Sequence, residues 1–206
     1  MSQITNGVRS ILSTPWIYDL LQNGVGARKM RRILCRDYIR AAPGMCMLDV
    51  GCGTAQILEQ LPVDIDYHGL DLSADYIDTA KKHFDHRGTF LCADITTLPA
   101  DEMPPCNLAI AIGILHHLDD NGARSLLHNL HQRLTPGGRL VTLDGLYCTG
   151  QSRAARWLIS KDRGQNVRTA DAYQSLVPDA FSSVEIFRRD DLLNIPYTHA
   201  IMVCCK

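Results

Sequence analysis

The sequence lacks an excess of charge of either sign. Its 206 residues include 21 Lys and Arg against 22 Asp and Glu, which gives a formal net charge of -1. A chain this close to neutrality has no general attraction to nucleic acid or to an anionic membrane surface. We therefore expect no nucleic-acid partner.

Long apolar runs are also missing. No stretch approaches the roughly 18 apolar residues that span a bilayer. The start of the chain lacks the basic segment, apolar middle and small-residue cleavage site of a signal peptide. We therefore expect no membrane insertion and a cytoplasmic location. The length suits one hydrophobic core, so a single domain over residues 1–206 is expected.

A C-x-x-C motif is absent, although the chain has eight cysteines. They are scattered, and several lie inside apolar segments. Paired cysteines at short spacing are the usual signature of a zinc site, so no metal site is expected. The cysteines are interpreted as free, mostly buried thiols in a reducing compartment.

What the sequence does contain is an alternation of helix-like and strand-like segments. Helices are expected at 27–40, 54–61, 73–84 and 120–134, and strands at 45–50, 67–72, 89–94, 107–115, 139–144, 182–189 and 198–205. Strands separated by helices predict βαβ units and a parallel sheet. The last two strands are joined by a loop alone, which favours an antiparallel pair at one edge.

The predicted fold class is therefore α/β: a mostly parallel, seven-stranded Rossmann-like sheet with helices on both faces and an antiparallel last strand. Residues 1–42 are expected to form an N-terminal helical region or lid, whose arginine run faces solvent. Residues 43–206 are expected to form the core, with 150–175 as an insertion on the substrate side. This insertion is expected to act as a lid on the acceptor pocket, with Gly164 as its hinge.

A glycine-containing turn follows the first expected strand, in "LDVGCGTAQ". Gly51 and Gly53 would let a ligand approach the backbone, and the helix expected next would offer free N–H groups. A dinucleotide site favours G-x-G-x-x-G, but Gln56 stands at the third glycine position. A Walker lysine is also missing, which disfavours a nucleoside triphosphate.

Three successive strands end in an acid: Asp49, Asp71 and Asp94. Asp71 lies 20 positions after Gly51, the spacing at which a carboxylate binds ribose hydroxyls. So much negative charge does not suit a pyrophosphate, but it suits a nucleoside ligand that carries a cationic amino or sulfonium group.

The segments "LDVGCGTAQ", "GLDLS", "CADI", "AIGILHHLDD" and "LTPGGRLVTLDG" resemble, in order and spacing, the class I S-adenosylmethionine-dependent methyltransferases. The resemblance is strong over residues 44–145. It implies that S-adenosyl-L-methionine is the cofactor, bound by residues at the ends of the strands. Gly51 and Gly53 would pass under its methionine part, with Asp49 supporting the amino group. Asp71 would bind the ribose, Leu72 would cover the adenine, and Asp94 and the Ile95 N–H would contact the adenine ring.

The resemblance further implies that the turn after the fourth strand faces the sulfonium. Gly113 would allow close approach there, and His116 would serve as the base that removes a hydroxyl proton. Asp144, at the end of the next strand, could orient His116. His117 is a second candidate for contact with the acceptor.

The acceptor is expected to be a small molecule, methylated on a hydroxyl oxygen. The [DN]-P-P-[YF] motif of many amino-methylating enzymes is absent after the fourth strand. Candidate acceptor contacts are Tyr18 in the N-terminal region, and Arg163 and Arg168, which would suit an anionic acceptor. Methylation of nitrogen, carbon or sulfur, methylation of RNA, and non-catalytic cofactor binding remain as alternatives. The sequence does not specify an oligomeric state.

Overall fold

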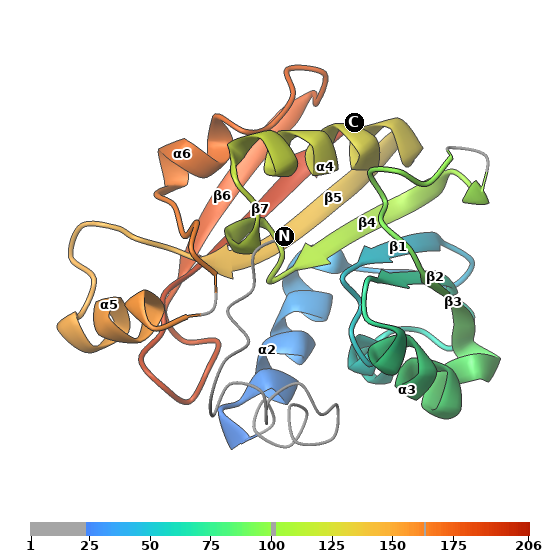
Figure 1. Cartoon of the computed structure of the whole chain (residues 1–206), viewed down its shortest axis with the longest axis horizontal. Coiled ribbons are helices and arrows are strands. Elements are labelled where there is room, and N and C mark those ends of the chain that lie inside the picture. The colour runs from blue at the N-terminus through green and yellow to red at the C-terminus, as the bar shows by residue number, and fades with distance from the viewer. Residues whose placement is uncertain (1–23, 100–101, 163) are drawn as a thin grey trace.

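A seven-stranded sheet forms the centre of the molecule (Figure 1). The structure is a computed structural model that describes residues 24–99, 102–162 and 164–206. The strand order is β3-β2-β1-β4-β5-β7-β6. The strands are β1 (Cys46–Val50), β2 (Asp66–Asp71), β3 (Gly88–Cys92), β4 (Cys106–Ile112), β5 (Leu134–Gly145), β6 (Ser183–Arg189) and β7 (His199–Cys205).

The pairing of these strands confirms the predicted fold class. The strands from β3 to β5 pair in parallel, whereas β7 is antiparallel to both of its neighbours, β5 and β6. Strand order reverses between β1 and β4, and in open α/β sheets ligands bind at the carboxyl ends of the strands beside such a reversal.

Helices cover both faces of the sheet, as predicted. In order they are α2 (Ala27–Leu34), α3 (Ala74–Phe84), α4 (Asp120–Arg133), α5 (Arg153–Ser160) and α6 (Ala170–Gln174). Figure 1 shows α2 and α3 below the sheet and α4 and α6 above it. Helix α3 begins as predicted from the sequence, because the Ser73 hydroxyl accepts a hydrogen bond from the Tyr76 N–H.

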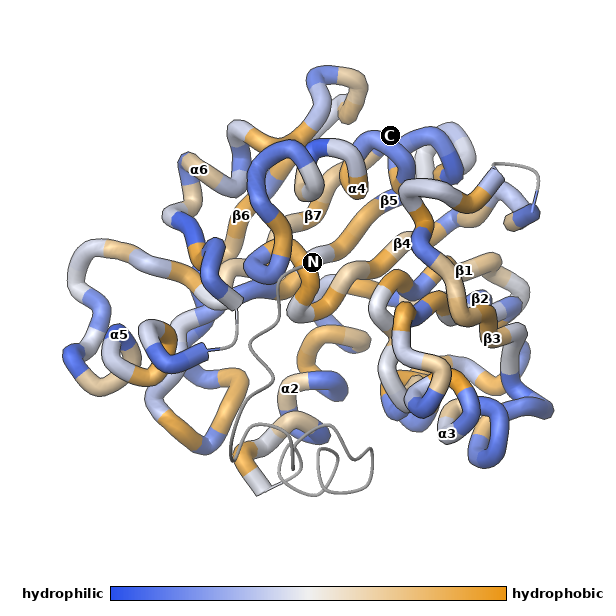
Figure 2. The backbone as a smooth tube through the Cα atoms, in the orientation of Figure 1, coloured by the Kyte–Doolittle hydropathy of each residue, from blue (hydrophilic) through white to orange (hydrophobic). Residues whose placement is uncertain are grey.

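Alternating strand residues supply two separate hydrophobic cores. Met47 and Leu108 face the core under α2 and α3, whereas their chain neighbours Leu48 and Ala109 face the core under α4. A strand covered on both faces must be apolar at successive positions. Figure 2 accordingly shows β4 and β5 mostly in the hydrophobic colour. The apolar runs of the sequence were therefore sufficient to predict these strands.

Two expectations about local structure were wrong. The expected helix at 54–61 is only a short 3-10 helix, Gln56–Gln60, because Ala55 takes a left-handed conformation with φ 58° and interrupts the turn. The arginine run of α2 does not lie wholly in solvent. Arg31 is 8% exposed and donates a hydrogen bond to Gln56 Oε1 at 2.6 Å, which joins α2 to the glycine turn.

Across the described residues, every helix is too short or too polar to cross a membrane.

Candidate functional site

The turn between β1 and the 3-10 helix lies at the carboxyl edge of the sheet. The N–H groups of Gly51 and Cys52 both donate to the Leu70 carbonyl, at 2.7 and 2.9 Å. Gly51 and Gly53 have positive φ values of 74° and 55°, which side chains rarely adopt. A Cβ on Gly51 would lie 2.1 Å from the Ile114 side chain, whereas one on Gly53 would have no atom of the described residues within 4 Å. Among the described residues, nothing therefore blocks the approach of a ligand to the backbone at Gly53.

Asp71 is fixed at the end of β2 by two backbone donors. Its Oδ2 accepts from the Gly53 N–H at 2.9 Å, and its Oδ1 accepts from the Ser73 N–H at 2.8 Å. A carboxylate has about four acceptor positions, so two remain for ligand hydroxyls. The next residue, Leu72, exposes 47% of its surface and offers an apolar platform beside this carboxylate.

Asp49 lies beneath the turn and is 3% exposed. Its Oδ2 accepts a hydrogen bond from the Tyr67 hydroxyl at 2.5 Å. Burial raises the pKa of Asp49 to about 7, assisted by the nearby charge of Asp71 and opposed by the Tyr67 hydrogen bond. Asp49 is thus a buried carboxyl beside the glycine turn, and its pKa lies near neutral pH.

Asp94 and Ile95 follow β3. The Asp94 Oδ1 accepts from both the N–H and the hydroxyl of Thr96, at 2.9 and 2.7 Å, so this oxygen shapes the turn. Ile95 packs its side chain into the core under α4 and is 3% exposed. The other Asp94 oxygen and the Ile95 backbone N–H are the groups expected to contact adenine. Both contacts remain predictions.

His116 and Asp144 are brought together as the sequence suggested. His116 lies in a short 3-10 turn, Leu115–His117, after β4, and Asp144 lies near the end of β5. The Asp144 Oδ1 lies 2.7 Å from His116 Nδ1 and also accepts the His116 backbone N–H at 3.1 Å. Both side chains are buried, which fixes the orientation of the imidazole and directs Nε2 away from Asp144.

A second acid, Asp162, faces the other ring nitrogen. Its Oδ1 lies 3.6 Å from His116 Nε2, and its Oδ2 accepts from the Tyr197 hydroxyl at 2.5 Å. Burial alone would lower the pKa of His116, but the hydrogen bonds and charges of Asp144 and Asp162 outweigh it and raise the pKa to about 9. The imidazole is therefore protonated at neutral pH while both acids face it.

The segment that carries Asp162 covers His116. The Asn166 N–H donates to the His116 carbonyl at 2.9 Å, and a Cβ on Gly164 would lie 1.8 Å from the His116 ring. Gly164 is thus required for close packing on the histidine rather than as a hinge. We call this segment, residues 162 and 164–168, the lid.

Arg168 has a different role from the one expected. Its Nε and Nη2 donate to Asp120 Oδ1, and its Nη1 and Nη2 also donate to the carbonyls of Leu115, Leu118 and Asn166, at 2.8 to 2.9 Å. An arginine has five N–H groups, and here each has a protein acceptor. This geometry argues against the predicted contact with an anionic acceptor, because Arg168 instead ties the lid to the turn that carries His116.

Of the other three residues predicted to contact the acceptor, the structure describes only His117. Tyr18 and Arg163 lie outside the described residues. The His117 ring packs on that of His116, with ring centroids 4.2 Å apart, at the same turn as Gly113.

Sequence reasoning missed Asp162 and Tyr197 as partners of His116. They come from the insertion and from the loop before β7, so no local motif joins them. Tyr197 stacks on His199, whose pKa burial lowers to about 4. The sequence offered one indication of this contact, namely that Asp162, Tyr197 and His199 are polar residues in segments with no assigned role.

Comparison with known families and proteins agrees with this geometry. Residues 47–138 match a family described as methyltransferase domain. An O-methyltransferase of Pyrenophora dematioidea is 28% identical over 156 residues, which are 67% of this chain and 57% of that protein. O-methyltransferase rstn1 of Aspergillus nomiae is 33% identical over 108 residues, 49% of this chain and 47% of that protein. The chain thus spans about half the length of these relatives.

Solved structures share the fold at lower identity. Human N-acetylserotonin methyltransferase in complex with SAM has a TM-score of 0.70 and 18% identity, and the match covers 92% of this chain and 55% of that one. N-methyltransferase NodS from Bradyrhizobium japonicum has a TM-score of 0.66 and 17% identity, with 87% and 96% covered. At these identities the likeness concerns the fold.

Proposed function

We propose that the chain is a class I S-adenosylmethionine-dependent methyltransferase and that it methylates a hydroxyl oxygen of a small molecule. The observation that carries this proposal is the His116–Asp144 pair at the carboxyl edge of the sheet, beside the glycine turn. The two curated relatives named above are O-methyltransferases, which supports oxygen as the atom that is methylated.

The residues at the carboxyl edge fit S-adenosyl-L-methionine. Asp71 is held by two N–H groups with acceptor positions left for a ribose diol, and Leu72 offers an exposed apolar side chain for a base. The open backbone at Gly53 and the nearby Asp49 suit the methionine part. When bound, this cofactor supplies an electrophilic methyl group.

His116 would act as the general base for the acceptor hydroxyl. Because Nδ1 is held by Asp144, the neutral imidazole would carry its lone pair on Nε2, which faces the lid. An acceptor hydroxyl must therefore lie at Nε2, where Asp162 now lies 3.6 Å away. Displacement of Asp162 would also remove a charge that keeps His116 protonated, so acceptor binding and activation of the base would occur together.

An anionic acceptor remains part of the proposal, although Arg168 no longer supports it. A groove of about 520 Å³ lies just beyond β5 and is lined by residues that include Tyr147 and Arg156. The exposed Arg156 guanidinium lies 5.1 Å from the centre of the Tyr147 ring. A carboxylate or phosphate on the acceptor could pair with this arginine.

The proposal is tested by incubating the protein with labelled cofactor and a panel of small hydroxyl compounds, and by mapping the methylated atom on the product. His116→Ala should lower kcat by roughly 10²–10⁴ at neutral pH and leave cofactor affinity nearly unchanged. His128→Ala, at an exposed histidine of α4, is the matched control. Full turnover by His116→Ala, or a methyl group on nitrogen, carbon or sulfur, would contradict the proposal.

A further inference from the structure

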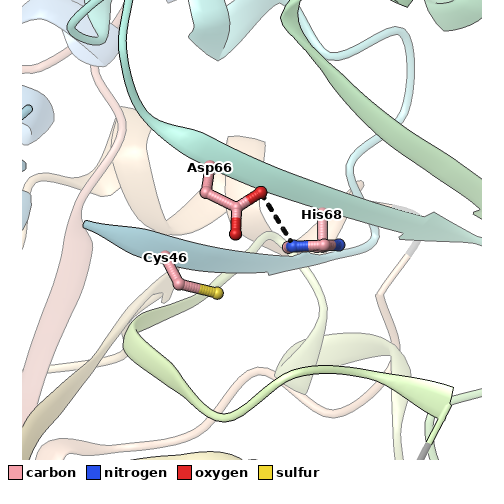
Figure 3. A group of neighbouring side chains, drawn as sticks. All are labelled: Cys46, Asp66 and His68. Carbon is pink, nitrogen blue, oxygen red and sulfur yellow. Dashed lines mark ion pairs between the residues drawn. The ribbon is translucent and has the colours of Figure 1, made fainter. Parts of the chain in front are cut away.

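Three side chains that commonly bind metals converge at the amino edge of the sheet, opposite the candidate site. Cys46 begins β1, Asp66 begins β2, and His68 follows two residues later (Figure 3). Cys46 and Asp66 are register partners in the parallel pair, and residues two apart on a strand share a face. All three side chains therefore lie on the same face of the sheet.

The donor atoms are close enough to share one ion. The Cys46 Sγ, an Asp66 oxygen and a His68 ring nitrogen all lie within 4.8 Å of one another. His68 Nε2 lies 3.1 Å from Asp66 Oδ1. Bond lengths at tetrahedral zinc place neighbouring ligand atoms about 3.4–3.6 Å apart. A small adjustment of the Cys46 side chain would complete such a geometry.

His68 Nε2 has an unusual environment for a buried nitrogen. It is inaccessible to solvent, and it is paired with Asp66 Oδ1 at 3.1 Å without the geometry of a hydrogen bond. Buried polar atoms normally have a well-directed partner, which this pairing alone does not give to Nε2. A cation bound between the two side chains would satisfy both, because each would direct a lone pair at it.

A water molecule can complete the coordination, because the Asp66 side chain is 63% exposed. The buried thiol of Cys106, at the start of β4, interacts with that of Cys46 but is not one of the converging ligand atoms. A cation would therefore reach the site from the side of Asp66.

From this cluster we infer that Cys46, Asp66 and His68 form a binding site for a zinc ion. Mixed sulfur, nitrogen and oxygen ligands suit zinc, whereas calcium and magnesium prefer oxygen alone. The site lies at the starts of β1 and β2, and the methyl-transfer residues lie at the ends of these strands. Its role is therefore structural: the ion joins the first two strands of the sheet and does not take part in catalysis.

The experiment uses the purified full chain, freed of metal with a chelator and kept reduced. Zn²⁺ affinity is measured by competition with a chromophoric chelator, and Co²⁺ serves as the spectroscopic probe. We expect one Zn²⁺ per chain, a visible Co²⁺ spectrum of a tetrahedral thiolate site, and a higher midpoint of thermal unfolding with Zn²⁺. Cys46→Ser and His68→Asn should each weaken binding by at least roughly 10–100-fold.

Two variants control for the other cysteines and histidines. Cys92→Ser and His86→Asn change exposed residues outside the cluster and should bind like the wild type. Circular dichroism establishes that each variant is folded before titration. Absence of equimolar binding by the folded wild type would overturn the site. So would equal affinity of the folded Cys46→Ser and His68→Asn variants, or a Co²⁺ signal that disappears in Cys92→Ser.

Discussion

Asp162 is the residue that most changes the chemistry expected of His116. One carboxylate on an imidazole orients it, as Asp144 does, but a second carboxylate on Nε2 stabilises the imidazolium. A base with a pKa of about 9 is mostly protonated at pH 7 and cannot accept a proton. The strength of this base thus depends on where the lid holds Asp162.

The first prediction follows from that dependence. Asp162→Asn keeps the shape of the side chain and removes its charge, so it should lower the pKa of His116. The ascending limb of the profile of kcat/KM against pH should therefore shift toward lower pH. Profiles of the wild type and the variant, with the same acceptor, provide the measurement. A limb at the same pH in both would mean that Asp162 has already moved away before the step that limits kcat/KM.

Asp71 carries the second prediction. Asp71→Ala removes the acceptor for the ribose hydroxyls and should weaken binding of S-adenosyl-L-methionine by about 1–3 kcal/mol. Calorimetry with S-adenosyl-L-methionine measures the change, and Asp78→Ala, at an exposed acid of α3, is the control. Because Asp71 also anchors Gly53 and Ser73, thermal unfolding must be followed in parallel. Unchanged affinity, or equally tight binding of NADH by the wild type, would exclude the assigned role.

At the scale of elements, the lid and the turn after β4 behave as one unit. Four of the five hydrogen bonds of Arg168 reach the turn at Leu115 and Leu118 and the start of α4 at Asp120. The Asn166 N–H adds a bond to the His116 carbonyl. A displacement of the lid that breaks the Arg168 contacts would therefore also disturb the histidine.

The third prediction concerns this connection. Arg168→Ala leaves buried carbonyl groups without a donor, and it should lower the free energy of unfolding by about 2–4 kcal/mol. Urea unfolding measures the loss. Arg153→Ala, at an exposed arginine of α5, should stay within about 0.5 kcal/mol of the wild type. A stable Arg168→Ala variant with a raised KM for an anionic acceptor would instead restore the role in acceptor binding that the sequence suggested.

The elements also show which kinds of inference the sequence supports. The strands and α3 were predictable because burial on two faces and a Ser73 cap are local patterns. The short 3-10 helix was not, because the left-handed Ala55 depends on how the glycine turn meets β2. The pairing of His116 with Asp144 was suggested by neighbouring strand ends. Its contact with Asp162 depends on the path of the insertion, which no periodicity encodes.

At the scale of the whole molecule, two buried histidines differ in their state of protonation. His116 carries a proton between Asp144 and Asp162, while His199 nearby stays neutral at pH 7 because burial lowers its pKa to about 4. The pKa of His116 therefore lies above neutral pH, at about 9, and that of His199 lies below it, at about 4. Stability and activity are coupled through the first of them, because the proton that favours the closed lid is the one that blocks the base.

The fourth prediction is the effect of this coupling on stability. The pKa of His116 is about 9 in the folded protein and about 6.5 in an unfolded chain, so the folded state binds the proton more tightly. Its contribution to the free energy of unfolding is fully present below about pH 6.5 and is lost as the pH rises through about 9. The change amounts to roughly 3 kcal/mol at most.

Urea unfolding of the wild type and His116→Asn, at several pH values across this range, isolates the contribution. The variant cannot bind the proton, so the difference in unfolding free energy between the two proteins should shrink steadily with rising pH. Groups elsewhere in the chain titrate in both proteins and cancel in the comparison. A difference that stays constant with pH would mean that His116 is neutral in the folded protein, and the acids facing it would then stabilise the fold through hydrogen bonding alone.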